Sequence, residues 1–365
     1  MRKQILMAGF SLLALAGGNA SADILVAIAG PMTGQYASAG DQIRKGAEMA
    51  IADINAKGGV LGQKLQLEVG DDACDPKQAV SVANTMVNKK IVFMHGHWCS
   101  SSTIPASDVY NEAQIPMATV STNPQVTERG LKNVFRIMGR DDQQGLVAGD
   151  FLAEHFKGKK IAVVDDKSAY GKGLADEIAK AMEAKGVKPT LRESITAGEK
   201  DYSGLVSKLK SAGVEVMAFG GYHTEVALIL RQAQQAGLKL TVMGGDTMTN
   251  SELVTAAGPA ADNVLFTFSP DPRKNPAAAS IVKKFRDAKV EPEGYVMYAY
   301  AAMQLFAEAA TAAKSTKYKD MEKALRDGSF ETVIGKLTFD AKGDNKLPGF
   351  KVYQWKGGKY DYVTK

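Results

Sequence analysis

The sequence predicts an α/β protein made of two doubly wound parallel-sheet lobes joined by a hinge. Short apolar runs alternate with amphipathic stretches along most of the 365 residues, which is typical of β–α units around a parallel sheet. The alternation forms two successive series. The chain is also longer than a domain with a single hydrophobic core usually is. No Pro- or Ser-rich linker separates the two series. We therefore expect short crossings that act as a hinge rather than a flexible tether.

The first series consists of apolar runs separated by helical patterns. The stretch 40–59 predicts a helix that ends in glycines suited to a C-cap, with one apolar face made by Ile43, Ala47, Ala50, Ile51 and Ile54. Asp75 and Pro76 are a helix start, and the pattern predicts a helix through Asn88. The other predicted elements of this series are strands over 23–30, 64–69, 91–96, 117–121 and 134–139 and a helix over 100–113.

The second series begins near Asp141 and repeats the same alternation. Its predicted helices cover 141–156, 171–186, 202–213 and 224–237, and its predicted strands cover 160–166, 216–221 and 241–246. The remaining chain predicts helices over 276–289 and 294–314 and strands over 336–340 and 350–355.

The N-terminus has the features of a secretory signal peptide. A positive start, MRK, precedes an apolar stretch, and Ala20-Ser21-Ala22 is a small-x-small cleavage site. We expect cleavage after Ala22, and no later stretch is apolar enough to span a bilayer. The sequence therefore predicts a soluble, exported protein of a bacterial periplasm.

Charge and cysteine content narrow the function further. The chain carries 45 Lys and Arg against 40 Asp and Glu, a net charge of +5, and the charges alternate without a basic block. This distribution argues against binding to nucleic acid.

The two cysteines of an exported chain predict a disulfide, Cys74–Cys99. Closing that loop contributes about 3 kcal/mol in the chain-entropy model.

The motif GHWCSSST (96–103) allows three kinds of site. A serine hydrolase elbow would need a glycine after the serine, and none follows Ser100. His95, His97 and Cys99 have the period-two spacing of metal ligands on a strand, but Cys99 is better placed in the disulfide. The third kind is an anion site, because Ser100 begins a helix where a strand ends and helix N-termini bind carboxylates or phosphates.

Other polar and aromatic residues follow predicted strands, at the edge where open α/β sheets bind ligands. The segment VSTNP (120–124) supplies further hydroxyls, and Asp246 ends a strand of the second series. A site for an anion on one lobe and an acid on the other together match an α-amino acid zwitterion. Trp98, Tyr170 and Tyr222 follow strand ends and are suited to wall an apolar pocket.

The sequence predicts no cofactor and no catalytic residue. It has no Gly-Lys-Ser/Thr phosphate loop, and no GxGxxG follows the first strand. A metal site is also not expected, since no fourth ligand accompanies the two histidines and Cys99.

Several longer motifs resemble the periplasmic leucine/isoleucine/valine-type binding proteins of ABC transporters. The matching stretches run from about 23 to 350 and include GPMTGQYASAGDQ, DDACDPKQAVSVAN, GHWCSSSTIPASDVY, STNPQVTERG, DKSAYGKGLADE, GGYHTEVALILRQA and FDAKGDNKLPGF. The resemblance implies a type I periplasmic binding protein fold, or flytrap, with ligand held between two lobes. It implies an N-terminal lobe of 23–140 plus about 271–348, and a C-terminal lobe of 141–270 plus about 349–365.

The resemblance also implies roles for individual residues. The ligand carboxylate would meet Ser100 and Thr122, and the ligand ammonium would meet a backbone carbonyl near Ser121 and the carboxylate of Asp246. The family usually has Glu at the position of Asp246. Tyr170 and Tyr222 would line the side-chain pocket, with a further aromatic residue near Tyr295.

Two positions depart from the leucine-type pattern. The family's aromatic residue between the first strand and the first helix aligns with Ala39, with Tyr36 close by, and its usual leucine before the second cysteine is Trp98. We expect Trp98 to shrink the pocket and Ala39 to open it.

The function expected on these grounds is capture of an amino acid, branched-chain or otherwise small and neutral, without chemistry. The expected partners are the ligand and the inner-membrane permease of an ABC transporter, and the chain is expected to be a monomer. Two alternatives stay open at this point. One is a soluble sensor that reports ligand occupancy to a receptor, and the other is a hydrolase of small amides.

Overall fold

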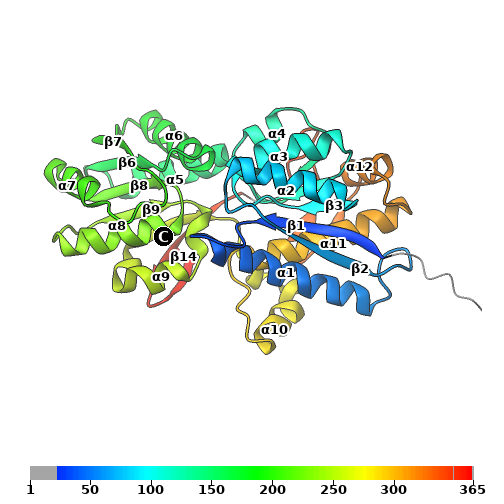
Figure 1. Cartoon of the computed structure of the whole chain (residues 1–365). Coiled ribbons are helices and arrows are strands. Elements are labelled where there is room, and N and C mark those ends of the chain that lie inside the picture. The colour runs from blue at the N-terminus through cyan, green and yellow to red at the C-terminus, as the bar shows by residue number, and fades with distance from the viewer. Residues whose placement is uncertain (1–22, 348, 364–365) are drawn as a thin grey trace, which may run out of the picture.

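The computed structural model describes residues 23–347 and 349–363. The predicted signal peptide, residues 1–22, and its cleavage after Ala22 lie outside the described residues. Two β-sheets occupy separate halves of the molecule, each covered by helices (Figure 1). The predicted α/β class with two parallel-sheet lobes is confirmed.

The first sheet is five-stranded and parallel throughout, in the order β2-β1-β3-β4-β5. Its half of the chain starts with β1 (Ile24–Gly30), α1 (Ala37–Ala56), β2 (Leu65–Asp71), α2 (Pro76–Asn88), β3 (Phe93–His95), α3 (Ser100–Glu112), β4 (Met117–Thr119), α4 (Gln125–Glu128) and β5 (Val134–Arg136). The order reverses between β1 and β3, which opens a crevice at their carboxyl ends.

The second sheet is seven-stranded, in the order β14-β13-β10-β9-β8-β6-β7, and only β13 and β14 run antiparallel to their neighbours. Its elements are α5 (Asp141–His155), β6 (Ile161–Asp165), α6 (Ala169–Ala184), β7 (Leu191–Ser194), α7 (Ser203–Ala212), β8 (Val216–Gly220), α8 (His223–Gln235), β9 (Thr241–Gly244), α9 (Glu252–Ala257), β10 (Val264–Phe268), β13 (Lys351–Lys356) and β14 (Lys359–Tyr362).

The segment between β10 and β13 returns to the first half, where α11 packs on α1 and β3. It contains α10 (Ala279–Asp287), α11 (Val296–Ala313), α12 (Tyr318–Asp327), β11 (Phe330–Thr332) and β12 (Gly335–Leu337). The chain thus passes between the two sheets three times, after β5, after β10 and before β13. The lobe boundaries near 140, 270 and 348 stay a prediction.

Local sequence signals account for most element boundaries. The helix α2 begins at Pro76 with the Asp75 side chain accepting a hydrogen bond from the Gln78 amide, and it ends at Asn88 as predicted. Sequence reasoning missed other elements. The strand β7 lies at the sheet edge with alternating exposure, and α12 is charged on one side, so neither stands out as an apolar run.

Small residues allow the helices to approach closely within each half. A Cβ built on Gly46 of α1 would lie 2.2 Å from the Val296 carbonyl oxygen of α11. A Cβ on Gly149 of α5 would lie 2.5 Å from the Ala181 Cβ of α6. Both distances are shorter than a Cβ atom ever comes to a non-bonded neighbour, so only glycine permits this packing.

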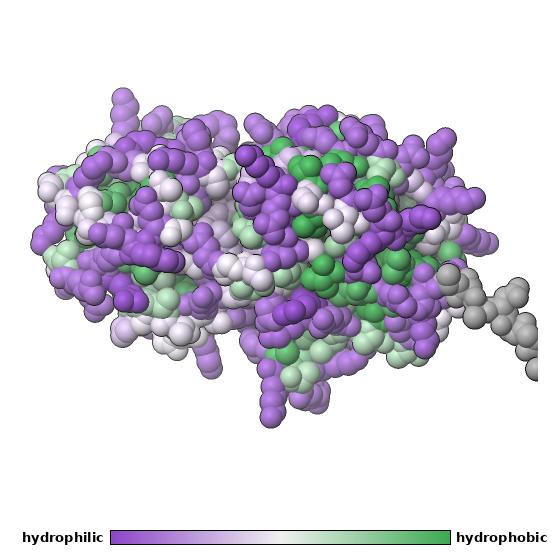
Figure 2. All heavy atoms as spheres, in the orientation of Figure 1, coloured by the Kyte–Doolittle hydropathy of each residue, from purple (hydrophilic) through white to green (hydrophobic). Residues whose placement is uncertain are grey.

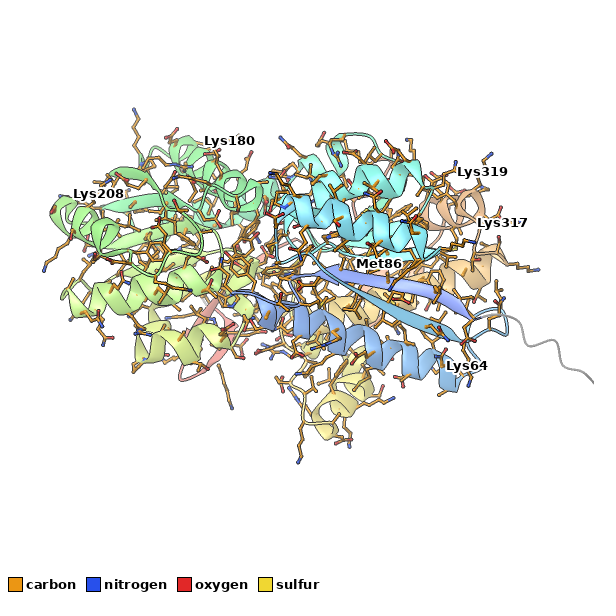
Figure 3. All side chains as sticks on the ribbon, viewed as in Figure 1. Lys64, Met86, Lys180, Lys208, Lys317 and Lys319 are labelled. Atoms are coloured by element: carbon orange, nitrogen blue, oxygen red, sulfur yellow. A yellow bond between two sulfur atoms is a disulfide. The ribbon has the colours of Figure 1, made fainter. Side chains whose placement is uncertain are left out.

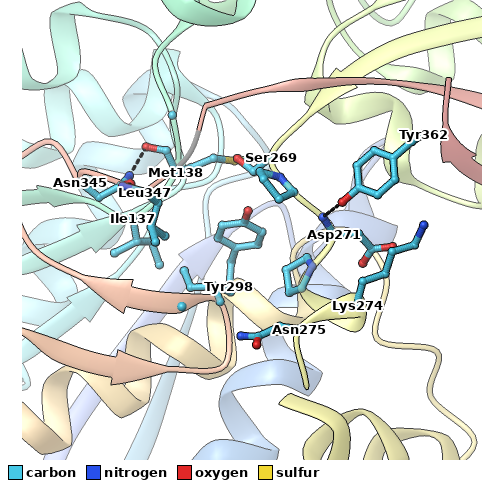
Figure 4. A pocket seen from close by; sticks show the side chains of 15 residues that line it. Ile137, Met138, Ser269, Asp271, Lys274, Asn275, Tyr298, Asn345, Leu347 and Tyr362 are labelled. Carbon is cyan, nitrogen blue, oxygen red and sulfur yellow. Dashed lines mark hydrogen bonds between the residues drawn. The ribbon is translucent and has the colours of Figure 1, made fainter. Parts of the chain in front are cut away.

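The three crossings surround a cavity at the hinge, drawn in Figure 4. Met138, Ser269 and Asn345 each come from a different crossing, and Asn345 Nδ2 donates to the Met138 carbonyl oxygen at 2.6 Å. The cavity has a volume of about 330 Å³. It lies beside the crossings, where the chain leaves the ends of β5 and β10.

The surface is mostly hydrophilic on the face in Figure 2, with hydrophobic residues gathered on the half that contains α1 and α2. Lys180, Lys208 and Lys319 lie at the periphery, whereas Met86 of α2 is buried against the sheet (Figure 3). In the described part of the chain, no helix combines the length and the apolarity that a bilayer crossing requires.

The predicted disulfide is confirmed. Cys74 and Cys99 are bonded, with their Cα atoms 5.5 Å apart. Cys99 is the N-cap of α3, so the bond attaches the start of this helix to the loop that precedes α2.

We expect the Cys74→Ala/Cys99→Ala double variant to lose about 3 kcal/mol of unfolding free energy, because the unfolded chain is no longer constrained by a closed loop. The urea midpoint of the variant should fall below that of the wild type. The wild type with its disulfide reduced should match the variant, and an unchanged midpoint in both would contradict this account.

Candidate functional site

A small cavity lies between the carboxyl ends of the two parallel sheets. In this closed arrangement its volume is about 10 Å³, roughly the space of one water molecule. The residues that line it are Trp98, Ser100, Val120, Ser121, Thr122, Tyr170, Tyr222, Asp246, Thr247 and Tyr295.

One wall of the cavity is the start of α3. Cys99 is extended, with φ −73° and ψ 132°, and Ser100 is the first helical residue. Among the described residues, no side chain caps this helix. Its first N–H groups and the positive end of its dipole thus face the cavity beside the Ser100 hydroxyl, which accepts from the Asn123 amide at 3.3 Å.

The segment Ser121–Asn123 is the second part of this wall, and a buried arginine holds it. Arg136 has no exposed surface, and its Nη1 donates to the carbonyl oxygens of Ser121 at 2.7 Å and Asn123 at 2.9 Å. Asp344 neutralises the guanidinium through a 2.7 Å ion pair. The Ser121 hydroxyl itself donates to the Trp98 carbonyl oxygen at 2.9 Å, so these bonds fix the backbone beside Thr122.

The opposite wall carries Asp246, which follows β9 and is only 3% exposed. Its Oδ1 accepts from Tyr170 at 2.9 Å and from Gln144 Nε2 at 3.0 Å, and its Oδ2 accepts from the Tyr295 hydroxyl. Burial raises the pKa of Asp246 to about 6, although the two tyrosine hydrogen bonds oppose the shift. Within residues 23–347 and 349–363, no basic side chain lines the cavity, so the carboxylate there lacks a counter-charge from this part of the chain.

A second buried carboxylate lies behind the cavity. Asp141 is the first residue of α5 and is fully buried. Burial, followed by the nearby charge of Asp246, raises the pKa of Asp141 well above its usual value. The charge of Asp246 therefore helps to keep Asp141 protonated.

Aromatic rings form the remainder of the cavity. The Trp98 and Tyr222 ring centroids are 5.3 Å apart, and Trp98 meets Tyr295 edge-on at 5.4 Å. Tyr170 contacts Tyr222 at 5.4 Å. These separations lie in the contact range for aromatic pairs, so the rings make a continuous wall.

All of the predicted ligand-binding residues meet at this cavity, namely Trp98, Ser100, Ser121, Thr122, Tyr170, Tyr222, Asp246 and Tyr295. Their individual roles stay predictions. Sequence reasoning missed the lining residues Val120 and Thr247, which adjoin the predicted ones in the chain. It also missed Gln144 and Arg136, for which the sequence carries no signal.

The expectation that Ala39 opens the pocket is wrong. Ala39 belongs to the first turn of α1, where it faces the hydrophobic core, and it does not line the cavity. Tyr36, the residue before α1, occupies the aromatic position instead, with its ring centroid 4.4 Å from that of Tyr222. Alignment by position failed here because the turn before α1 directs Tyr36, rather than Ala39, toward the cleft.

His97 of the GHWCSSST motif and His95, which precedes the motif, have packing roles. His97 is fully buried, with Nδ1 2.5 Å from Asp72 Oδ2 and Nε2 3.2 Å from the Tyr110 hydroxyl. Burial lowers the pKa of His95 to about 4, which keeps it neutral. The described residues contain no cluster with metal-ligand character, and neither histidine lines the cavity beside Ser100.

Direct contacts join the two halves around the cavity. Asn123 Nδ2 donates to the Ala169 carbonyl oxygen at 2.6 Å, and the Tyr36 hydroxyl donates to Glu225 Oε1 at 3.1 Å. With the lining residues almost fully buried, these bonds describe a closed arrangement of the lobes.

Comparison with known proteins agrees with this geometry. Residues 23–359 match a family described as "Periplasmic binding protein". The chain is 51% identical to a Leu/Ile/Val-binding protein homolog 1 of Brucella melitensis over all of both chains. It is 45% identical to a leucine-, isoleucine-, valine-, threonine- and alanine-binding protein of Pseudomonas aeruginosa, over 95% of this chain and 94% of the relative.

A crystal structure shows the same architecture. A leucine-binding protein from Thermotoga maritima superimposes with a TM-score of 0.86 and 26% identity, covering 93% of this chain and 98% of the other. Together with the two sheets, the three crossings and the cavity between the halves, these matches show that the chain belongs to the periplasmic binding protein family.

Proposed function

We propose that this chain captures an amino acid between its lobes and delivers it to the permease of an ABC transporter. The observation that carries the proposal is the pairing of two opposite walls. An uncapped helix N-terminus with the Ser100 hydroxyl faces a cavity whose other side holds the buried carboxylate of Asp246. The relatives named for amino-acid binding in Brucella and Pseudomonas support this assignment.

The ligand carboxylate binds at the first wall. It accepts hydrogen bonds from the first N–H groups of α3 and from the hydroxyls of Ser100 and Thr122, and the helix dipole favours its charge. The ligand ammonium binds at the second wall, where Asp246 supplies the opposite charge. The Ser121 carbonyl oxygen, which already accepts from Arg136, retains a second lone pair for the ammonium.

Closure of the lobes follows from the same contacts. The ligand touches both walls only when the cavity is shut, so its binding shifts the lobes toward the closed arrangement. A permease that distinguishes closed from open lobes would then receive loaded protein only. We place the mature chain in the periplasm as a monomer, after cleavage behind Ala22.

We expect the Asp246→Asn variant to bind its amino acid roughly 10- to 100-fold more weakly, because a hydrogen bond to a charged group is worth about 1.5–3 kcal/mol. Isothermal titration calorimetry measures the change, after a thermal-shift screen over amino acids has identified the ligand. The variant should stay folded at pH 7, since it removes a buried charge whose pKa is raised.

The matched control for that variant is Glu183→Gln, which neutralises an exposed acid of α6 away from the cavity. Its affinity should equal that of the wild type. Unchanged affinity in the Asp246→Asn variant would refute the assigned role of this carboxylate.

Ligand affinity should also depend on pH. The pKa of Asp246 is about 6 in the ligand-free protein, so below pH 6 its carboxyl group is protonated and the ammonium meets a neutral partner. Affinity should therefore fall as the pH is lowered from 7 to 5, approaching about tenfold per pH unit when one proton is displaced.

Calorimetry at several pH values measures this dependence. Asp166 is a second buried acid with a pKa of about 6, so the Asp246→Asn variant serves as the reference. If the variant shows the same slope with pH as the wild type, the titrating group is not Asp246.

A further inference from the structure

Three consecutive residues of the second half, Asn250, Ser251 and Glu252, are hydrogen-bonded to the first half. Asn250 Nδ2 donates to the Ser38 hydroxyl oxygen at 2.8 Å, and the same hydroxyl donates to Glu252 Oε2 at 2.5 Å. The Ser251 amide donates to Glu293 Oε1 at 3.2 Å. Ser38 belongs to the first turn of α1, whose start points toward the half that contains α9 (Figure 1). We call these three bonds the α9 contact.

The side of the α9 contact that belongs to the second half is held in place by its own bonds. Asn250 Oδ1 accepts from the Glu252 amide at 2.9 Å, and His223 Nε2 lies 3.1 Å from Glu252 Oε2. Because a carboxylate only accepts hydrogen bonds, Nε2 carries the hydrogen in this pair. The bond from His223 lowers the pKa of Glu252, so the carboxylate is ionised at neutral pH. The acceptor for the Ser38 hydroxyl is therefore already formed within the second half.

The α9 contact is separate from the cavity but is joined to it by a short, buried segment. Ser38, Glu293 and residues 250–252 are not among the residues that line the cavity. The 3-10 helix Asp246–Thr249 leads from the cavity to Asn250, and all of residues 246–250 are at most 4% exposed. One movement of the second half therefore brings Asp246 to the cavity and Asn250 to Ser38.

We propose that the α9 contact is a latch that holds the lobes closed and sets the rate at which the bound amino acid is released. The inference rests on the proposed function, and it adds positioning residues that do not touch the ligand. A hydrogen bond between the halves exists only when they are closed, so each bond of the contact shifts the lobes toward the closed arrangement. Because the apparent affinity scales with the fraction of binding-competent protein, the latch strengthens the binding of every ligand by the same factor.

The size of the effect follows from the number and the exposure of the bonds. A typical hydrogen bond changes an equilibrium constant by about 2- to 12-fold, and an exposed charged partner contributes less because water screens it. The Glu252 side chain is 45% exposed, whereas Asn250 is almost fully buried. Removing the Ser38 hydroxyl breaks the bonds to both, so we expect binding to weaken by about 3- to 10-fold.

Stopped-flow fluorescence and calorimetry on the full mature chain test the inference, with L-leucine, L-alanine and any further amino acid found in the thermal-shift screen as probes. Trp98 lines the cavity, so its fluorescence reports binding. Ser38→Ala and Glu293→Ala should each raise the dissociation rate constant, by about 3- to 10-fold for Ser38→Ala. The association rate constant should stay near that of the wild type, because the amino acid enters the open form, in which these bonds are absent.

Ser81→Ala is the matched control, since Ser81 is an exposed serine of α2 in the same half as Ser38. Its rate constants should equal those of the wild type. The double variant Ser38→Ala/Glu252→Ala gives a second comparison. Once the Ser38 hydroxyl is absent, Glu252 has already lost its bond to the first half, so the double variant should release the amino acid at the rate of Ser38→Ala.

The outcomes distinguish the latch from the proposed function. Unchanged dissociation in either single variant, or tighter binding of the probes, would overturn the latch and leave amino-acid capture standing. A changed ratio of the leucine and alanine affinities would also overturn it, because a contact away from the cavity acts on all ligands alike. A wild type that binds none of the amino acids in the thermal-shift screen would overturn the proposed function and this inference with it.

Discussion

The burial of one carboxylate organises the site. Removing an ionised group from water is costly unless hydrogen bonds or an opposite charge replace the lost hydration. Asp246 receives three hydrogen bonds, from Tyr170, Gln144 and Tyr295, but no cationic side chain in the described part of the chain lines its cavity. Tyr295 belongs to the half that contains α1, so this carboxylate also links the two halves. A ligand ammonium would supply the opposite charge that this carboxylate lacks.

The opposite wall depends on bonds that keep backbone groups in position. Arg136, neutralised by Asp344, fixes the carbonyl groups on either side of Thr122. The disulfide fixes the start of α3 from the other side. Because these supports involve buried charges or a covalent bond, the wall is rigid before the ligand arrives. Closure of the lobes then brings the wall with Asp246 against a first wall that is already in place.

The fold and most of the site could be predicted from the sequence because their signals are local. Buried parallel strands are apolar runs, and the residues that follow them collect at one edge of a sheet, which is why Trp98, Ser100, Tyr170, Tyr222 and Asp246 could be grouped. The strand β7 and the helix α12 escaped prediction because an edge strand and an exposed helix bury little and carry weak patterns.

The sequence by itself determined the two-lobed α/β class, the disulfide between Cys74 and Cys99, and the presence of hydroxyls and an acid at strand ends. Only the tertiary structure decided that Tyr36, rather than an aromatic residue at the position of Ala39, fills the space behind the pocket. The reason is physical. The contact of Tyr36 with Tyr222 and its bond to Glu225 join residues almost two hundred positions apart, and such pairs form only when the lobes pack against each other.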